Sequence, residues 1–139
     1  MIGDGPMAIF GAPLPLVDLA GATVRAARER VEQFSAERVE AGRVPIRIGI
    51  GIGIGIGIGI APGEAVADCT GTRRRAPCTW VSETLNRASR LEAHTRTCGH
   101  AVLIDAMTAG ALGKGDVVEQ LVDTQFHGIA APVEAYAAA

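Results

Sequence analysis

The sequence lacks an excess of charge of either sign, any disulfide or zinc-binding pattern, and any long run of consecutive apolar residues. Its 13 Lys and Arg nearly balance its 15 Asp and Glu, for a net charge of −2, which argues against non-specific nucleic-acid binding and against a polybasic membrane surface. The three cysteines form no CxxC pair, and an odd number suits a reducing compartment better than a disulfide scaffold. The three histidines are scattered without zinc-ligand spacing.

The chain carries enough apolar residues to fold. At 139 residues and 48% hydrophobic content it is expected to be one globular domain with a buried core rather than a disordered chain. Its first residues show neither a basic segment nor an apolar one, so no secretory signal is expected. We therefore expect a cytoplasmic protein with no membrane segment.

Residues 48–60 alternate strictly between Ile and Gly. A membrane-spanning helix would need about 20 apolar residues and few glycines, and a GxGxxG loop does not fit the alternation. A GxxxxGK loop needs a following Ser or Thr, but the only Gly-Lys pair, Gly113-Lys114, is followed by Gly115. As a strand, the run places every Ile on one face, but it would span about 43 Å at ~3.3 Å per residue, and slips by two residues would preserve the pattern. We interpret it as an expanded core strand.

Helices and strands are expected to interleave along the rest of the chain, which predicts the α+β class. Residues 17–40 have the spacing of an amphipathic helix, with Arg28 and Glu32 paired and Gly42 ending it. A second helix is expected over 82–97, with Ser82 as N-cap and Gly99 as stop. Further expectations are a strand at 63–67, a turn at 71–75, a short segment at 78–81, a strand at 101–104, a short helix capped by Asp105 through Leu112, a strand at 117–122 and a final strand pair around 125–136.

Few residues suggest chemistry by themselves. Asp4 lies between two glycines, as in a hairpin tip, although Asp-Gly is common in turns and a plain turn is favoured from these residues alone. The three arginines at 73–75 could bind phosphate or form a solvated basic turn. Asn86 and Arg90 are spaced i, i+4, which places an amide and a guanidinium on one helix face. Such a pair could orient a sugar oxygen and neutralise charge on a phosphoryl group, or simply form a polar surface.

Four stretches, taken in order, resemble a known family. They are IGDGPMAIFGAPLP, RIGIGI followed by PGEAV, CTWVSETLNRASRLEAHT and FHGIAAPVEAYA. The catalytic domain of class III adenylyl/guanylyl cyclases has similar sequence motifs: IGDGVMAVFGAP, RIGIGIHTGEVV, YTVIGDTVNLASRLEA and LKGxxxPVEVY. The resemblance covers essentially the whole chain. It implies a ferredoxin-like βαββαβ fold and the conversion of ATP to 3′,5′-cyclic AMP and pyrophosphate.

The resemblance also implies roles for individual residues. In this family two divalent ions, Mg²⁺ or Mn²⁺, bind the phosphates and activate the ribose 3′-hydroxyl. Asp4 corresponds to the second metal-binding aspartate, Asn86 would orient the ribose, and Arg90 would stabilise the pentavalent phosphate. Counting back from Asn86, Thr79 falls at the base-selecting position, where Asp or Thr accompanies adenine. A shift of one residue would instead bring Cys78 there, as in guanylyl cyclases.

The chain also departs from the family pattern. The family's first metal aspartate and its adenine-reading lysine precede the IGD motif, so the opening strand and first helices are expected to be lacking. His and Thr of the family's HTG are Ala61 and Pro62 here, Gly and Asp of its IGD-like helix start are Ser82 and Glu83, and Pro6 lies in a strand that should donate a backbone bond. One carboxylate would hold two Mg²⁺ ions poorly, so we expect residues 1–139, as a partial catalytic domain, to be inactive alone.

Two functions follow from the resemblance. Cyclase sites in this family form at a dimer interface, with metal ligands from one subunit and the Asn and Arg from the other. This chain could therefore form a homodimer, or a heterodimer in which it lends Asn86 and Arg90 to a complete cyclase domain. The alternative is a non-catalytic, dimerising pseudo-cyclase or the remnant of a degenerate gene. Relative to the family, the strand at 48–60 carries about eight surplus residues, or four Ile-Gly units.

Overall fold

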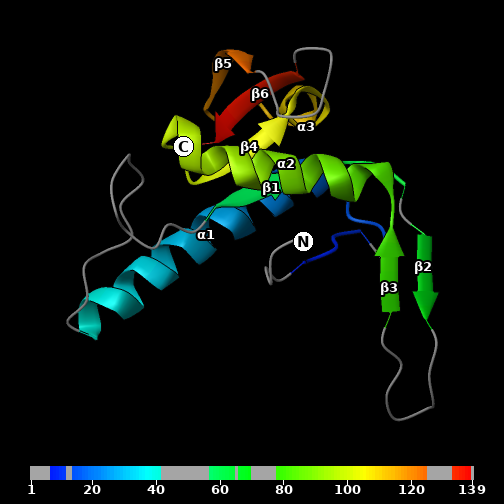
Figure 1. Ribbon diagram of the computed structural model, residues 1–139, viewed down its shortest axis with the longest axis horizontal. Helices are drawn as coiled ribbons and strands as arrows, with labels where there is room; N and C mark the ends of the chain where they lie inside the picture. Colours follow the sequence, from blue (N-terminus) through cyan, green and yellow to red (C-terminus); the bar gives the residue numbers. More distant parts are fainter. Residues whose placement is uncertain are drawn as a thin grey trace.

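A computed structural model of the chain describes residues 7–11, 14–41, 57–64, 66–69, 78–124 and 133–138. Figure 1 shows the arrangement of the helices and strands. In chain order they are α1 (Leu19–Glu40), β1 (Ile58–Ile60), β2 (Val66–Cys69), β3 (Cys78–Val81), α2 (Glu83–Cys98), β4 (Val102–Asp105), α3 (Ala106–Ala111), β5 (Val118–Thr124) and β6 (Val133–Ala138). The mixture of helices with strands confirms the expected α+β class.

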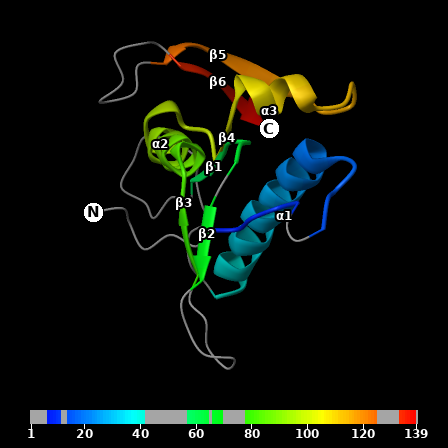
Figure 2. The same ribbon diagram turned by 90° about the vertical axis from the view of Figure 1, so that its right-hand side faces the viewer.

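The strands form two sheets. The larger has four strands in the order β1-β4-β6-β5, of which β1 and β4 are parallel and the other neighbours antiparallel. The second sheet is the antiparallel pair β2 and β3. This hairpin projects away from the larger sheet beside the start of α2 (Figures 1 and 2).

The helices cover both faces of the larger sheet. Figure 2 shows α2 on one side of β1 and β4, and α1 with α3 on the other. The core is accordingly divided into two clusters. On the α1 side the buried residues are Val24, Ala27, Ala101, Val102, Ile104 and Ala138, with Ile58 and Ile60 packed against them. On the α2 side they are Leu91, Leu103, Ala135 and Ala137.

The predicted second helix is confirmed almost to the residue. Ser82 is the N-cap of α2, and its hydroxyl oxygen accepts a hydrogen bond from the backbone N–H of Leu85 at 3.1 Å. Gly99 ends the helix in the left-handed region, at φ 78°, a conformation that glycine adopts without steric cost. Both signals are local in sequence, which is why the bounds of this helix could be predicted.

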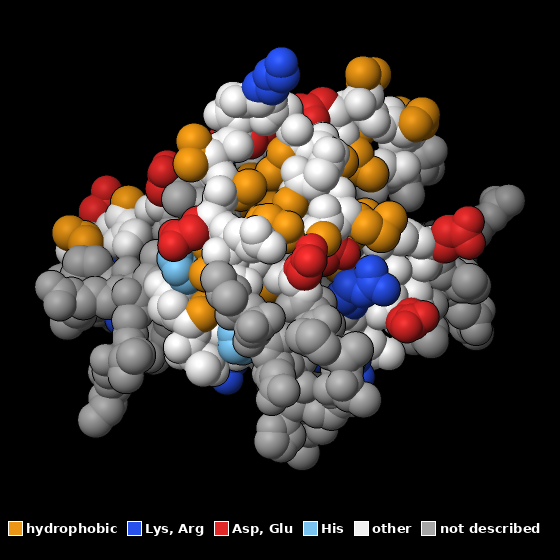
Figure 3. Space-filling view, turned by 90° about the horizontal axis from the view of Figure 1, so that it is seen from above, with side chains coloured by type: hydrophobic (Ala, Val, Ile, Leu, Met, Phe, Trp, Pro, Cys, Tyr) orange, Lys and Arg blue, Asp and Glu red, His pale blue; other side chains and the backbone are white. Residues whose placement is uncertain are grey.

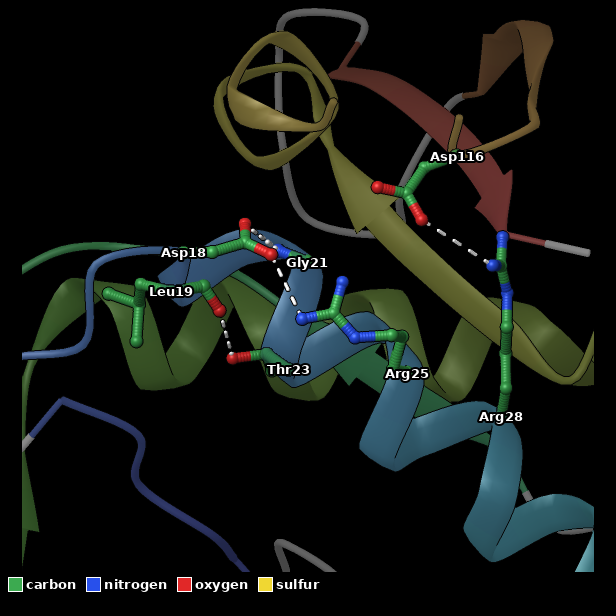
Figure 4. Close-up of polar contacts among 7 residues, drawn as sticks. All are labelled: Asp18, Leu19, Gly21, Thr23, Arg25, Arg28 and Asp116. Carbon is green, nitrogen blue, oxygen red and sulfur yellow. Dashed lines mark hydrogen bonds and ion pairs between the residues drawn. The ribbon is translucent and has the colours of Figure 1, made fainter. Parts of the chain in front are cut away.

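The first helix begins two residues later than predicted, because Asp18 is its N-cap. The Asp18 carboxylate accepts a hydrogen bond from the N–H of Gly21 at 3.1 Å and forms an ion pair with Arg25 at 2.9 Å (Figure 4). The expected pairing of Arg28 with Glu32 is wrong. Arg28 points instead toward the segment after α3, where its guanidinium lies 3.8 Å from Asp116 (Figure 4).

The first strand of the hairpin was predicted too early. It begins at Val66, because Gly63 has a φ of 154° and interrupts the extended backbone. The buried strand predicted at 101–104 is found as β4, and Asp105 caps α3 as expected, through its bond from the N–H of Thr108 at 2.8 Å. The strand predicted at 117–122 is found as β5. Of the strand pair predicted around 125–136, β6 is found, and residues 125–132 lie outside the described residues.

Several predictions fall on residues that the structure does not describe. They concern the hairpin tip at Asp4, the strand around Pro6, the helix stop at Gly42, the turn at 71–75, and most of the Ile-Gly run. Of that run, Gly57 and β1 are described, so the strand character of the alternation is confirmed only at its final residues.

Candidate functional site

Helix α2 presents Asn86 and Arg90 on its exposed face, one turn apart. The buried residues of the helix, Leu91 and Thr95, face the sheet. The guanidinium carries only hydrogen-bond donors, and the amide carries both donors and an acceptor. The two side chains that the sequence singled out are therefore free of the core on one side of the molecule, and both could contact an anionic ligand or a partner subunit.

Glycines in β1 fix how closely α2 approaches the sheet. A Cβ atom on Gly59 would collide with the carbonyl oxygen of Ala88 and would lie 2.5 Å from the backbone nitrogen of Glu92. A Cβ atom on Gly57 would likewise collide with the side chain of Thr95. The backbone of the helix thus lies against the backbone of the strand, and only glycine leaves room for it. The alternation has two uses here, because Ile58 and the other Ile of β1 pack on the opposite face.

A third glycine contact lies at the start of α2. Gly63 adopts a φ of 154°, and a Cβ atom there would collide with the side chain of Thr84. Ser82 and Glu83, which replace the Gly and Asp of the family motif, serve as N-cap and as an acidic residue in the first helical turn. Both are favourable at a helix N-terminus. This departure from the family pattern therefore has a structural explanation.

Thr79 lies in β3, paired in register with Asp68 of β2. Strand β3 leads into α2 through the single residue Ser82. The predicted base-selecting position is thus on the hairpin next to the start of the helix that carries Asn86 and Arg90. The structure brings these three positions to one region of the molecule.

The described residues do not fit a divalent-metal site. Among them, no group of three or more His, Cys, Asp or Glu side chains could hold an ion. The predicted metal ligand Asp4 lies outside these residues. What α2 offers is an amide and a guanidinium, which are groups that orient and neutralise an anion rather than ligate a metal.

A buried carboxylate behind α2 was not predicted as part of the site. The guanidinium of Arg87 lies 3.4 Å from a carboxylate oxygen of Asp105, whose side chain is only 5% exposed. The other oxygen of Asp105 accepts hydrogen bonds from the N–H and the hydroxyl of Thr108, both at 2.8 Å. The sequence signalled only the capping role of Asp105, because its partner on α2 is 18 residues away.

Two side chains among the described residues, Asp18 and His94, have shifted pKa values. The hydrogen bond from Arg25, and then that from the N–H of Gly21, hold the pKa of Asp18 below its usual value. Partial burial lowers the pKa of His94 on α2. On the face seen in Figure 3, acidic and basic side chains are interspersed with hydrophobic ones, as expected for a chain of nearly balanced charge.

Some apolar side chains of the described residues are exposed. Most of the large ones precede or begin α1, and the most exposed are Leu14 at 76% and Val17 at 109%. None of the helices in the described part of the chain is long and apolar enough to cross a membrane.

Comparison with solved structures identifies the fold. The adenylyl cyclase CyaB from P. aeruginosa matches over 94% of this chain with a TM-score of 0.69 and 21% identity. The guanylate cyclase domain of RhGC from Catenaria anguillulae, in complex with GTP, matches over 91% with a TM-score of 0.67 and 23% identity. A rhodopsin-guanylyl cyclase catalytic core with converted specificity, in complex with ATPαS, matches over 94% with a TM-score of 0.66 and 22% identity.

This chain spans about two thirds or less of those proteins, namely 64%, 63% and 64% of their respective lengths. No family model matches the sequence, and no curated protein does. The structural likeness nevertheless agrees with the four motifs that carry the sequence resemblance, and it covers nearly the whole chain. The chain has the fold of the catalytic domain of class III adenylyl and guanylyl cyclases.

Proposed function

We propose that this chain supplies the Asn86 and Arg90 half of a shared ATP-cyclising site, in a dimer with a complete cyclase catalytic domain. The observation that carries the proposal is the exposure of both side chains on one face of α2, beside the hairpin that bears Thr79. A partner seated on this face could place a nucleotide against them. The ligands of the Mg²⁺ or Mn²⁺ ions at this shared site are assigned to the partner, because the resemblance places them on the subunit opposite the Asn and Arg, and the described residues of this chain hold no carboxylate cluster.

The reaction proposed is the conversion of ATP to 3′,5′-cyclic AMP. The ribose 3′-oxygen bonds to the α-phosphorus, the bond from that phosphorus to the bridging oxygen breaks, and pyrophosphate leaves with the electron pair, while the hydroxyl proton passes to solvent. Asn86 would hold the ribose by hydrogen bonding, which keeps the 3′-oxygen in line. Arg90 would donate to the α-phosphate oxygens as negative charge grows on them. Thr79 would contact the adenine edge.

Complementation tests this function directly. A complete adenylyl cyclase domain is inactivated by alanine at its own equivalents of Asn86 and Arg90, while its metal-binding aspartates are retained. Mixing it with this chain is expected to restore cyclic AMP formation from Mg²⁺-ATP or Mn²⁺-ATP, whereas the chain alone yields none. Asn86→Ala or Arg90→Ala should lower the restored rate by roughly 10²–10³-fold, the usual effect of removing one donor to a transition-state oxyanion.

The matched control is Arg96→Ala. Arg96 lies on the same helix, but it is highly exposed and paired with Glu92, and its loss should leave the restored rate unchanged. Replacing ATP by GTP, with wild-type chain and with Thr79→Ala, tests base selection. Absence of restored activity in a mixture that demonstrably forms the dimer would contradict the proposal.

A second function is favoured by the same lack of a carboxylate cluster among the described residues. In this alternative the chain is a non-catalytic pseudo-cyclase that only dimerises. It predicts that the chain binds a complete domain, yet that Arg90→Ala has no effect on any product formed.

A further inference from the structure

Arg87 lies on α2 between the two residues to which catalysis is assigned, but its side chain takes another direction. Its side chain is 39% exposed, and its guanidinium reaches Asp105 at the end of β4. The adjacent Asn86 and the following Arg90 remain on the exposed face. A side chain of the sheet-facing flank is thus tied to a fixed point while its neighbours face outward.

Asp105 is a rigid anchor for this tie. Its backbone is paired with Ala135 of β6, and one of its carboxylate oxygens is occupied by the two bonds from Thr108. The remaining oxygen is the one that Arg87 contacts. Because strand pairing and helix capping both hold Asp105, the ion pair restrains the helix rather than the strand.

The other contacts of α2 set its distance from the sheet. The glycine contacts with β1 determine how closely the helix lies on the strand, and Leu91 is buried beneath its middle. The α2 residues at these contacts, Ala88, Leu91, Glu92 and Thr95, form one stripe along the helix. Arg87 lies beside that stripe and reaches Asp105 at the end of β4, so its ion pair adds a restraint on rotation of the helix about its axis. Since helix side chains extend roughly 5–6 Å from the axis, a rotation of about 10° moves their ends by about 1 Å.

We propose that Arg87 is a positioning residue whose ion pair with Asp105 sets the rotation of α2 and so aims Asn86 and Arg90 at the nucleotide. This role rests on the proposed function. A displacement of about 1 Å of a positioned group can cost roughly 100-fold in rate. Arg87 is partly exposed, and the buried Asp105 keeps its two bonds from Thr108 when Arg87 is replaced, so the cost in folding stability should be small. The role therefore predicts a large effect on turnover with a small effect on melting.

The kinetic test uses the complementation mixture. Arg87→Gln should lower kcat by roughly 10–100-fold with the KM for ATP and the melting temperature little changed, and Arg87→Lys, which keeps the charge, should recover part of the loss. Asp105→Asn keeps the helix cap, because Asn caps as well as Asp, and should reproduce the loss. The double variant Arg87→Gln/Asp105→Asn should be no worse than either single variant, since both remove one interaction. Arg96→Gln is the control and should behave as wild type.

A second measurement does not depend on activity. In nuclear magnetic resonance spectra of the labelled chain, Arg87→Gln should shift the backbone amide of Thr108 and the side-chain amide of Asn86, whereas Arg96→Gln should shift neither. If wild-type chain fails to complement but these resonances move, the proposed function fails and the coupling of Arg87 to the orientation of α2 stands. If wild-type chain complements and Arg87→Gln is fully active, or if the Asn86 resonance does not move, the positioning role is overturned.

Discussion

Helices α1 and α2 lie on opposite faces of the same sheet but are held to it in different ways. The α2 backbone lies directly against β1, and at the glycine positions of this strand there is no room for a side chain. The longer α1 packs through side chains, and its buried residues, Gly21, Val24 and Ala27, all lie in its first half. The rest of α1 extends beyond the sheet (Figures 1 and 2).

This difference shows where the fold tolerates change. Side-chain packing can adjust by repacking, whereas contact between two backbones cannot. The helix that carries the candidate site is thus on the less adjustable face. Its position should depend on which residues of the Ile-Gly run occupy β1, and α1 should be much less sensitive to them.

The largest expected effect comes from shifting the Ile-Gly alternation by one residue. Deleting residues 53–59 would place Ile52 where Gly59 lies beneath α2, and would place glycine where Ile58 packs against the core. Ile58 is partly buried, so its loss costs at most about 1.5–3 kcal/mol, and overpacking costs about 1–3 kcal/mol more. Against a total stability of roughly 5–15 kcal/mol, we expect little soluble, folded protein.

The matched deletion of residues 52–59 removes four Ile-Gly units and restores the pattern. It would place Gly51 beneath α2 and Ile50 in the core. We expect soluble yield and melting temperature at least equal to those of the full chain, because fewer registers compete. If the eight-residue deletion were the less stable of the two, the interpretation of the run as a core strand with four surplus Ile-Gly units would be wrong.

The next effect tests the backbone contact at a single position. Gly59→Ala adds one methyl group against Ala88 and should destabilise the protein by about 1–3 kcal/mol, the usual cost of overpacking. Gly110→Ala is the control, because a Cβ atom there meets nothing within 4 Å and Ala favours a helix. Urea unfolding of both variants measures the difference. Equal stability of the two would mean that α2 can move away from β1 without cost.

A smaller effect is expected on the α1 face. Arg28 donates to the carbonyl oxygen of Val117 at 3.0 Å and pairs with Asp116. Arg28→Ala should lower stability by about 1 kcal/mol, typical of one hydrogen bond that is partly open to solvent. Arg25→Ala, on the same helix but with half of its side chain exposed, is the control and should change stability less. Thermal melts of both variants measure the two losses of stability. A loss for Arg25→Ala as large as that for Arg28→Ala would contradict this expectation.

The smallest effect concerns the N-cap of α1. The pKa of Asp18 is lowered in the folded state by Arg25 and by the N–H of Gly21, so the stabilisation is present above the unfolded pKa and is lost as pH falls through the folded pKa. Asp18→Asn keeps the cap but loses the charge that Arg25 pairs with, so it should melt slightly below wild type at neutral pH. It should lose less stability than wild type as pH falls below about 4. Parallel acid dependence of the two proteins would be the contrary result.

Much of the fold could be predicted because its signals are local. The bounds of α2 follow from Ser82 and Gly99, and the start of α3 follows from Asp105, since each cap bonds within a few residues. The first strand of the hairpin was misplaced because Gly63 has a φ of 154° and lies where a Cβ atom would collide with Thr84, a residue 21 positions away in the sequence. The predicted pairing of Arg28 with Glu32 was wrong because Arg28 pairs with Asp116. Asp116 lies 88 positions away in the sequence, so local spacing could not indicate it.

The sequence by itself determined the cyclase-like fold and the exposed pair Asn86 and Arg90, because motif order and i, i+4 spacing are properties of the chain alone. It also determined that one face of the Ile-Gly strand is apolar. Only the tertiary structure decided that the other face must be bare for α2 to lie on it. It likewise decided that Arg87 meets Asp105. Both depend on distances between segments far apart in sequence, and these distances exist only after the sheet and its helices have packed.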